Sequence, residues 1–493
     1  MDQIEYARDE QASNKQPVPE TALSGTGAVN SLGLGDKSVS RGGVTLAAVA
    51  LVAGALAALS RRSAPAGVRG PPSFALVDRN LAWASPAVLD SSPQRRLYAG
   101  TNPDRAVTVE DLRAMAHRRL PGFALEYLEG GSEDEASLTR NIAALAEWRF
   151  LHRSMADVSR RDISTTLFGR KMALPVAVAP TGLNELFWPH ADLRLAQAAA
   201  EAGIPFAQST MSNDGMSRVA RVPGLRYWWQ LYVFGLPEIR ETLIERARNN
   251  GCEALIVTVD AQIYGNREWH SRTMSDPTAL TLSSKLDALM HPRWLAGGIL
   301  THGMPRFENV IEFVPKDRRR FFDSARWIRS QMDRALSWQT IARIRERWPR
   351  KLIIKGLLSI EDVVKAAEIG ADAVAISNHG GRQLDWAVAP LDLLPATRQA
   401  VGDRIAILVD GGMRRGTDVI KAVALGADAV LVGRAVLYGV AAAGKDGAKR
   451  ALTIFREEIE RDLGLLGVPS IAELSSRLLV RFSQPRVSGD SIH

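Results

Sequence analysis

One segment of this sequence combines a general base with a binding group for an acid: Ser377-Asn378-His379-Gly380-Gly381-Arg382. The imidazole of His379 suits proton abstraction, because histidine alone has an unperturbed pKa near neutrality. Asp260 could orient that ring and stabilise its protonated form. Arg382 and the distant Arg267 could bind a carboxylate through paired N–H donors. These residue types therefore suit removal of a proton from a substrate that carries a carboxylate.

Two further segments could bind a phosphate, namely Asp410-Gly411-Gly412-Met413-Arg414 and Gly433-Arg434. Glycine lets backbone N–H groups approach an anion closely, and the N-terminus of a helix adds favourable partial charge. Arg414 and Arg434 would add charge-assisted hydrogen bonds. The two segments predict a phosphorylated ligand before any family is considered.

A lysine at position 355 has two interpretations. It follows the short apolar run 352–354, so it could be the nucleophile of a Schiff-base aldolase or a fixed cation in a binding site. The residues alone leave both open. Taken singly, the other candidates also have ordinary structural explanations, since glycine is common in turns and buried polar side chains often satisfy backbone groups.

The elements that must position these residues are short apolar strands alternating with amphipathic helices. The predicted strands cover residues 174–179, 204–209, 226–232, 254–259, 352–354, 373–377, 405–409 and 429–432. The predicted helices include 191–202, 237–249, 360–369 and 417–425, each ended by a glycine. Repeated βα units predict a parallel sheet, and eight of them predict an α/β fold of the TIM (β/α)8 barrel type.

The polar candidates stand where these strands end, which is where such barrels carry their reactive groups. In strand order they are Pro180, Thr181 and Gly182, then Ser209, then Gln230 and Tyr232, then Thr258 and Asp260, then Lys355, then the segments after residues 376, 409 and 432. Eight polar strand ends in register predict a single site at one rim of the barrel.

About ninety residues separate the fourth strand from the fifth, far more than a βα connection needs. The end of this stretch resembles the missing helix, so residues 269–332 are predicted to be an insertion on the functional face. The insertion mixes aromatic and aliphatic residues with Arg and Lys. This composition suits a lid, a patch that binds a membrane surface, or a segment that simply packs on the barrel.

Residues 1–105 are predicted to be a non-globular leader, and residues 106–493 the barrel. Within the leader, 44–59 is an uncharged apolar run flanked by arginines, and 63–105 is a proline-rich linker. The run predicts a membrane anchor or part of an organelle-targeting sequence, with an alanine-rich soluble helix as the alternative. The C-terminus is not the Ser-Lys-Leu peroxisomal signal.

Composition narrows the possible functions. The 493 residues are 46% hydrophobic and 24% charged, which is the balance of a globular protein with a large core. The single cysteine, Cys252, cannot form an intramolecular disulfide and gives no metal-ligand spacing, so no metal is predicted. The formal net charge of +8 is not gathered into a basic stripe with aromatics, so nucleic-acid binding is not expected.

The motifs resemble those of the FMN-dependent 2-hydroxy acid oxidase and dehydrogenase family over residues 106 to about 480. The most specific blocks are 377–382 and 410–418, supported by Gln230-Leu231-Tyr232-Val233 and Lys355-Gly356. Residues 180–184 followed by Trp188-Pro189, and later 291–294, are most similar to the mandelate dehydrogenase branch.

The resemblance implies a role for each candidate. FMN would rest on Pro180, Thr181 and Gly182, with Ser209, Gln230, Thr258 and Lys355 at its ring and ribityl chain, Ser377 beside them, and Asp410, Gly412, Arg414, Gly433 and Arg434 at the phosphate end. Tyr127, Arg267 and Arg382 would bind the substrate carboxylate, Gly182 would lie beside the substrate, and Tyr232 would hold the hydroxyl. His379 would be the base, with Asp260 as its partner, and Lys355 would stabilise negative charge on the reduced flavin.

The activity implied is oxidation of an L-2-hydroxy acid, mandelate-like or lactate-like, to the 2-oxo acid. Gly182 resembles the dehydrogenase branch, so a quinone or a cytochrome is expected as electron acceptor. The alternatives are an oxygen-using oxidase, a Schiff-base aldolase barrel and a non-catalytic scaffold. A homo-oligomer is also expected, membrane-associated or targeted to an organelle and not peroxisomal.

Overall fold

The computed structural model describes residues 96–276 and 279–482. The chain divides into two units, Met1–Ser92 and Pro93–His493, and the fold described below belongs to the second. The apolar run 44–59 lies outside the described residues. Residues 96–105, predicted as the end of the linker, are part of the folded unit: the backbone N–H of Tyr98 donates to Asp111 over 2.8 Å.

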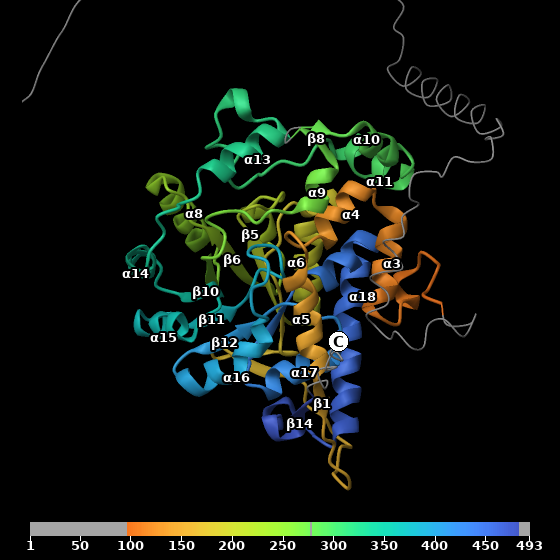
Figure 1. Ribbon diagram of the computed structural model, residues 1–493, viewed down its shortest axis with the longest axis vertical. Helices are drawn as coiled ribbons and strands as arrows, with labels where there is room; N and C mark the ends of the chain where they lie inside the picture. Colours follow the sequence, from red (N-terminus) through yellow and green to blue (C-terminus); the bar gives the residue numbers. More distant parts are fainter. Residues whose placement is uncertain (1–95, 277–278, 483–493) are drawn as a thin grey trace, which may run out of the picture. The chain divides into compact units, whose positions relative to one another are not determined.

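Eight parallel strands close into a barrel in the order β10-β11-β12-β13-β4-β5-β6-β7, with β7 pairing to β10 (Figure 1). They are β4 (Val176–Val178), β5 (Pro205–Ser209), β6 (Arg226–Tyr232), β7 (Ala254–Thr258), β10 (Lys351–Leu357), β11 (Ala373–Ile376), β12 (Ala406–Val409) and β13 (Ala429–Val432). The predicted TIM barrel is therefore confirmed, and each strand overlaps its predicted range. Nearly every strand residue is buried, because the strands lie between the barrel interior and the helices.

The barrel interior is a packed core. Small side chains such as Ala177, Ala207 and Ala373 contact Ile353 and Leu431 there, which leaves no room for a channel. The hairpin of β2 (Thr165–Leu167) and β3 (Arg170–Met172) adds two buried side chains to the same core. The barrel interior is therefore not a ligand site, and the rim is where a ligand of the barrel can bind.

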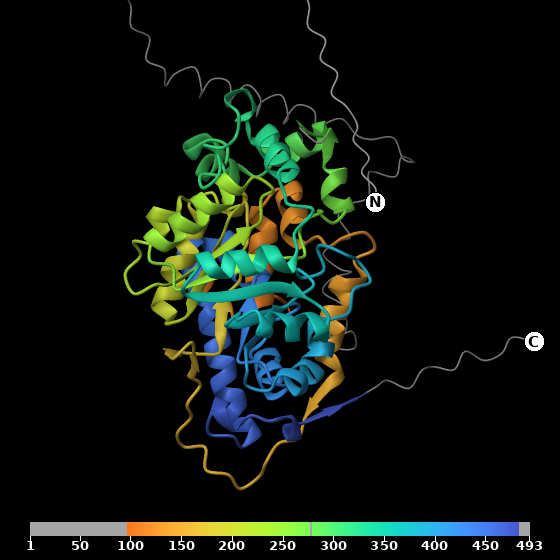
Figure 2. The same cartoon turned by 90° about the vertical axis from the view of Figure 1, so that its left-hand side faces the viewer.

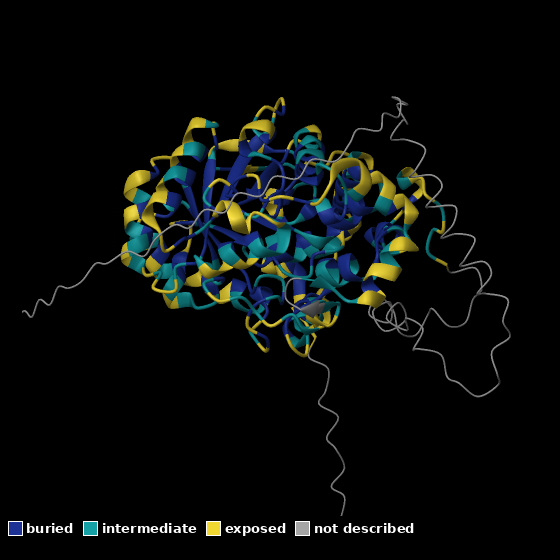
Figure 3. Cartoon of the chain, turned by 90° about the horizontal axis from the view of Figure 1, so that it is seen from above, coloured by how far each residue is buried: buried dark blue, intermediate teal, exposed yellow. Residues whose placement is uncertain are grey.

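Helices surround the strands, and Figure 3 shows buried strands inside helices whose outer faces are exposed. The ring contains α6 (Ala191–Ala202), α7 (Met216–Val219), α8 (Pro237–Asn249), α14 (Trp338–Arg347), α15 (Ile360–Glu368), α16 (Pro390–Val401), α17 (Gly416–Ala424) and α18 (Arg434–Leu466). Three earlier helices, α3 (Val109–Arg119), α4 (Gly122–Glu129) and α5 (Ala136–Glu147), precede the barrel strands. Gly203 ends α6 in the left-handed conformation at φ 69°, as its glycine predicted.

The long connection between β7 and β10 folds as a separate layer of short elements. These are α9 (Glu268–Arg272), β8 (Met274–Asp276), β9 (Ala279–Leu280), α10 (Leu282–Leu289), α11 (Pro292–Gly297), α12 (Ile299–His302) and α13 (Phe321–Ser330), before α14 returns to the ring. Figures 1 and 2 show this layer at one end of the barrel and the pair β1 (Trp148–Phe150) with β14 (Leu479–Arg481) at the other.

Close packing within α18 gives a test of the fold. The helix is kinked at Ala443 and Gly444, and a Cβ added to Gly439 would lie 2.3 Å from the carbonyl oxygen of Gly447. We expect Gly439→Ala to lower the free energy of unfolding by about 1–3 kcal/mol, because two backbone segments must separate. Urea unfolding followed by tryptophan fluorescence measures this.

The matched control is Gly464→Ala in the same helix, where the nearest atom to an added Cβ is 3.4 Å away on the flexible side chain of Arg161. We expect this change to be neutral or to stabilise by up to about 1 kcal/mol, since alanine favours helix more than glycine does. Equal stability of the two variants would contradict the close packing.

Candidate active site

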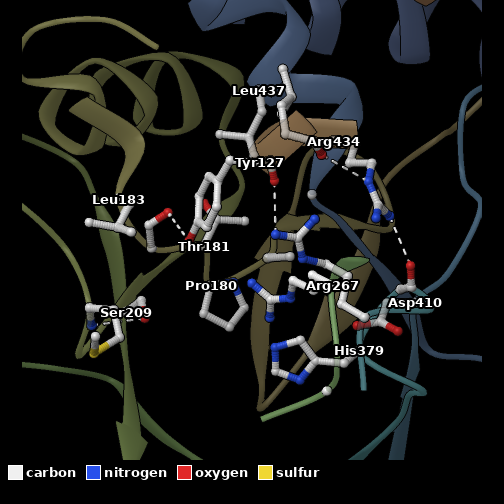
Figure 4. A pocket seen from close by; sticks show the side chains of 18 of the residues that line it. Tyr127, Pro180, Thr181, Leu183, Ser209, Arg267, His379, Asp410, Arg434 and Leu437 are labelled. Carbon is white, nitrogen blue, oxygen red and sulfur yellow. Dashed lines mark hydrogen bonds between the residues drawn. The ribbon is translucent and has the colours of Figure 1, made fainter. Parts of the chain in front are cut away.

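A cavity of about 380 Å³ opens at the carboxyl ends of the strands, between the barrel rim and the insertion. Most of the predicted site residues line it: Tyr127, Pro180, Thr181, Gly182, Ser209, Tyr232, Arg267, Lys355, His379, Arg382, Asp410, Gly412, Arg414, Gly433 and Arg434. Figure 4 shows Leu183 and Ser209 on one side, Arg434 and Asp410 on the other, and His379 next to Arg267 between them. The segments that seemed unrelated in sequence therefore converge.

The remaining four predicted residues lie directly behind the cavity wall. Gln230 accepts a hydrogen bond from the Ser209 hydroxyl over 2.9 Å and donates to Thr258 over 2.9 Å. Ser377 accepts from Lys355 Nζ over 2.7 Å. Asp260 contacts His379, as described next. All the predicted residues thus belong to one connected group.

His379 occupies a strained backbone position that aims its ring at the cavity. Its φ is 58°, in the left-handed region that non-glycine residues rarely adopt, and Gly380 and Gly381 follow at 66° and 76°. The Ser377 hydroxyl accepts from the His379 backbone N–H over 2.9 Å and so helps to hold this turn. Such strain persists where surrounding contacts fix it, often at functional sites.

The two ring nitrogens of His379 have different surroundings. Nδ1 lies 3.0 Å from Asp260 Oδ1, whereas Nε2 lies 3.4 Å from the Tyr232 hydroxyl. Burial lowers the pKa of His379 below its ordinary value, against the opposing effect of Asp260 and with help from Lys355 and Arg267. The pKa of Asp260 is itself lowered, because His379 and Lys355 outweigh its burial. The site therefore holds a neutral imidazole oriented by a carboxylate.

Lys355 is a buried, charged residue. Its Nζ lies 3.0 Å from Asp410 Oδ2. Burial opposes the charged form, yet Asp410 and Asp260 raise the pKa of the lysine above its ordinary value. A protonated amine is not a nucleophile, so this geometry favours the fixed cation over the aldolase interpretation.

Two cavity arginines are held by main-chain carbonyls at the C-terminal end of α4. Arg382 donates to the carbonyl oxygens of Gly130 and Tyr127 over 2.7 and 2.8 Å. Arg434 donates to Leu128 and Gly130 over 3.1 Å each. The last carbonyls of a helix lack intrahelical partners and carry partial negative charge, so they orient guanidinium groups without neutralising them.

Uncompensated positive charge is the main electrostatic property of the cavity. Burial, followed by repulsion from Arg267 and Arg434, lowers the pKa of Arg382 well below its ordinary value. Burial, opposed by Tyr438 and reinforced by Arg414, lowers the pKa of Arg434 to about 10. Among the lining residues Asp410 is the only acid, and it pairs with Lys355. The net positive charge of the lining therefore favours the binding of anions.

The residues present fit a phosphorylated flavin. At one end, α18 begins at Arg434 with Gly433 as its cap and no capping side chain, which leaves N–H groups for a phosphate beside Arg414. Gly411 and Gly412 have φ of 96° and 85°, and a Cβ on Gly412 would lie 2.9 Å from the backbone of Asn141. Lys355, Ser209 and the Gln230–Thr258 pair offer polar groups for a flavin ring.

Several cavity residues were not predicted from the sequence. Among the described residues, Tyr264 Oη and His270 Nδ1 are buried polar atoms without a hydrogen-bond partner. Burial, then Arg267 and Arg382, lowers the pKa of His270 to about 4, so its ring is neutral. Tyr264 lies between Asp260 and Arg267, and His270 follows in α9, so inspection of the residues from 260 to 272 could have found both. Met211, Phe307, Ala325 and Arg329 carried no comparable signal.

Comparison with known proteins gives a consistent result. Residues 116–481 match the family described as FMN-dependent dehydrogenase. The chain is 41% identical to (S)-mandelate dehydrogenase of Pseudomonas putida over 369 residues, 74% of this chain and 92% of that protein. It is 40% identical to an L-lactate dehydrogenase of Pectobacterium atrosepticum over 382 residues, 77% of this chain and 98% of that protein.

A solved structure of the "monotopic membrane protein (S)-mandelate dehydrogenase" also matches, with a TM-score of 0.73 and 40% identity. The alignment covers 76% of this chain and 100% of that chain. These matches confirm the resemblance predicted from the motifs.

The buried ion pair gives a prediction that does not depend on activity. Lys355→Met leaves Asp410 buried without its partner, so we expect a loss of about 3–5 kcal/mol in the free energy of unfolding. The control is Lys351→Met on the same strand, whose ion pair with Asp372 is 43% exposed on the lysine side and is expected to contribute less than about 1 kcal/mol. Urea unfolding at neutral pH compares them, and equal losses would contradict a special role for burial.

Proposed function

The chain belongs to the FMN-dependent dehydrogenase family, and from that premise we propose that it oxidises an L-2-hydroxy acid, mandelate-like or lactate-like, with His379 as general base. It is an enzyme with FMN as its cofactor. The observation that carries the proposal is that an imidazole oriented by a carboxylate shares one cavity with two guanidinium groups. Bound FMN supplies the acceptor for two electrons, and the protein supplies orientation and charge.

In this proposal FMN is held by three groups of residues. Pro180, Thr181 and Gly182 would contact the flavin ring, and Ser209, Gln230, Thr258, Lys355 and Ser377 would provide polar groups for it. Gly412, Arg414, Gly433 and Arg434 would hold the phosphate, and Asp410 would lie at this end of the cofactor while paired with Lys355. The support is that all but three of these residues line the cavity; Gln230 and Ser377 bond to the lining residues Ser209 and Lys355, and Thr258 bonds to Gln230.

The substrate carboxylate is bound by Arg267, Arg382 and Tyr127. The Tyr127 hydroxyl already lies at the cavity, donating to the carbonyl oxygen of Gly182 over 3.3 Å. Arg382 lies over the Tyr127 ring, with its guanidinium carbon 5.2 Å from the ring centroid. Burial strengthens the attraction of these groups for an anion, because water does not screen it.

Proton transfer occurs at His379 Nε2, since Nδ1 faces Asp260. The proton that leaves the substrate, from the hydroxyl or from the α-carbon, is taken at this nitrogen, and Asp260 stabilises the imidazolium that results. Tyr232 holds the substrate hydroxyl near the base. Burial raises the pKa of Tyr232 well above its ordinary value, so it remains a hydrogen-bond donor. Lys355 stabilises negative charge that develops at the bound cofactor.

A quinone is the proposed electron acceptor, delivered from a membrane. The insertion carries six exposed apolar side chains, which we name together the α10–α12 patch: Leu282, Leu286, Leu289, Met290, Leu300 and Met304, which are 50–72% exposed. Lys285 and Arg293 lie among them in the sequence, a combination typical of surfaces that bind lipid. The related structure is named as a monotopic membrane protein. Within residues 96–276 and 279–482, no helix is both long and apolar enough to cross a bilayer.

The base assignment predicts how activity changes on substitution and with pH. His379→Gln is expected to keep bound flavin while slowing anaerobic flavin bleaching by an L-2-hydroxy acid by about 10²–10⁴-fold. In the wild type, kcat/KM should fall on the acid side only below the ordinary histidine range, because the lowered pKa keeps the ring neutral there. Stopped-flow bleaching across pH measures both.

A matched variant checks the partner of the base. Asp260→Asn removes the group that raises the His379 pKa. The fall of kcat/KM on the acid side should therefore move to still lower pH, and turnover should decrease. Asp317→Asn, an exposed acid of the insertion, is the control and should leave the profile unchanged. Normal turnover in His379→Gln would refute the assignment.

Membrane binding is tested with vesicles. Changing Leu282, Leu286, Leu289 and Leu300 together to Ser should lower the fraction of full-length chain that sediments with lipid vesicles by at least about tenfold, since burying each leucine is worth up to about 1.5–3 kcal/mol. The control changes three exposed apolar residues elsewhere, Leu151, Met155 and Leu465, to Ser. Both variants are also made in a chain that lacks residues 44–59, so that binding by this segment cannot mask binding by the patch. If the leucine variant of the shorter chain binds vesicles as well as the shorter chain itself does, the patch is not the membrane-binding surface.

A further inference from the structure

Part of the cavity wall has no role in the chemistry proposed above. It includes Met211 after β5, Tyr264 after β7, and Phe307, Ala325 and Arg329 from the insertion. The substrate carboxylate and hydroxyl are already assigned to other residues. The remaining wall is therefore available for the substituent of the hydroxy acid.

Two of these residues are polar and contact each other. The guanidinium carbon of Arg329 lies 4.7 Å from the ring centroid of Tyr264. The Tyr264 hydroxyl is buried and has no hydrogen-bond partner among the described residues. Burial, against the effect of Arg267, raises the pKa of Tyr264 to about 12, so its hydroxyl is a donor at neutral pH. A buried donor without an acceptor indicates that a ligand supplies one.

The charges of the cavity also favour an acidic group at this end of the ligand. Five guanidinium groups line it, belonging to Arg267, Arg329, Arg382, Arg414 and Arg434. In the proposed function the cofactor phosphate faces the last two and the substrate carboxylate faces Arg267 and Arg382. Within the described part of the chain Arg329 has no carboxylate partner, and the one acid of the lining is paired with Lys355. Arg329 is an exposed residue at the edge of this cavity, so water solvates its guanidinium until an anion binds there.

We propose that Tyr264 and Arg329 bind a second acidic group, so that the preferred substrates are L-2-hydroxy acids whose substituent ends in a carboxylate. This inference rests on the proposed function. Arginine offers only donors and binds carboxylate in a planar, paired geometry, and the phenol adds a third donor. Met211, Phe307 and Ala325 provide apolar contact for the carbons between the two ends. A cationic substituent would be repelled, and an apolar one would leave the Tyr264 hydroxyl unpaired.

The test compares substrates that differ only at the far end. The first pair is (S)-2-hydroxyglutarate and (S)-2-hydroxypentanoate, and the second is (S)-4-carboxymandelate and (S)-4-methylmandelate. Anaerobic flavin bleaching of the full-length holoenzyme gives kcat/KM for each. We expect the carboxylated member to be preferred in at least one pair, and Arg329→Met to reduce that preference by about tenfold or more, the magnitude of one charge-assisted hydrogen bond.

Two further variants define the site. Tyr264→Phe should reduce the same preference by a smaller factor, because it removes a neutral donor. Arg326→Met changes an arginine of the same helix that does not line the cavity, and its preference should equal that of the wild type. Calorimetry with 2-oxoglutarate and 2-oxopentanoate on the oxidised holoenzyme gives a second measurement, in which the dicarboxylate should bind more tightly to the wild type and lose that advantage in Arg329→Met.

The outcomes separate the two proposals. If no hydroxy acid bleaches the flavin, the proposed function is wrong. If the uncarboxylated acids bleach it but the carboxylated ones are not preferred in kinetics or in binding, the inference about Tyr264 and Arg329 fails while the proposed function stands. A preference for the carboxylated acid that survives in both Arg329→Met and Tyr264→Phe would likewise overturn the inference.

Discussion

The site depends on positive charge that is oriented without being neutralised. Arg382 and Arg434 are fixed by the carbonyls that end α4 rather than by carboxylates, so their charge remains available to a ligand. Partial charges at a helix end hold a guanidinium in place at little cost to its attraction for anions. The region before the barrel, which contains α4, is therefore as necessary to the site as the strands are. Without it Arg382 would lose both of these hydrogen bonds, and Arg434 would keep only its bond to the carbonyl oxygen of Gly380.

A single hydroxyl connects the cation of the site to its base. Ser377 accepts hydrogen bonds both from Lys355 Nζ and from the backbone of His379. The left-handed turn at His379 and the buried Lys355–Asp410 pair are thereby parts of one network. Groups in such a network constrain one another, which keeps Nδ1 of the imidazole on Asp260 and leaves Nε2 for a substrate. This arrangement supports the proposed division between a neutral base and a permanently charged lysine.

The insertion has two surfaces with different chemistry. Its inner side contributes Phe307, Ala325 and Arg329 to the cavity, and its outer side carries the α10–α12 patch. In the further inference the first surface selects the substrate, and in the proposed function the second brings the enzyme to its electron acceptor. Because both belong to one connection of the barrel, substrate choice and membrane binding can change without alteration of the strands that hold the cofactor.

The sequence by itself determined the barrel and nearly all of the polar rim. Apolar strands and glycine-ended helices are local patterns, and a strand end such as Ser209 or Asp260 is located once its strand is known. The motif around His379 was likewise complete in six consecutive residues. Only the tertiary structure decided that Tyr264, His270 and Arg329 share the cavity, that Lys355 is paired with Asp410, and that residues 96–105 pack on the folded unit. Such contacts join segments distant in sequence, and the position of Arg329 depends on the path of a long insertion that has no barrel repeat to fix its register.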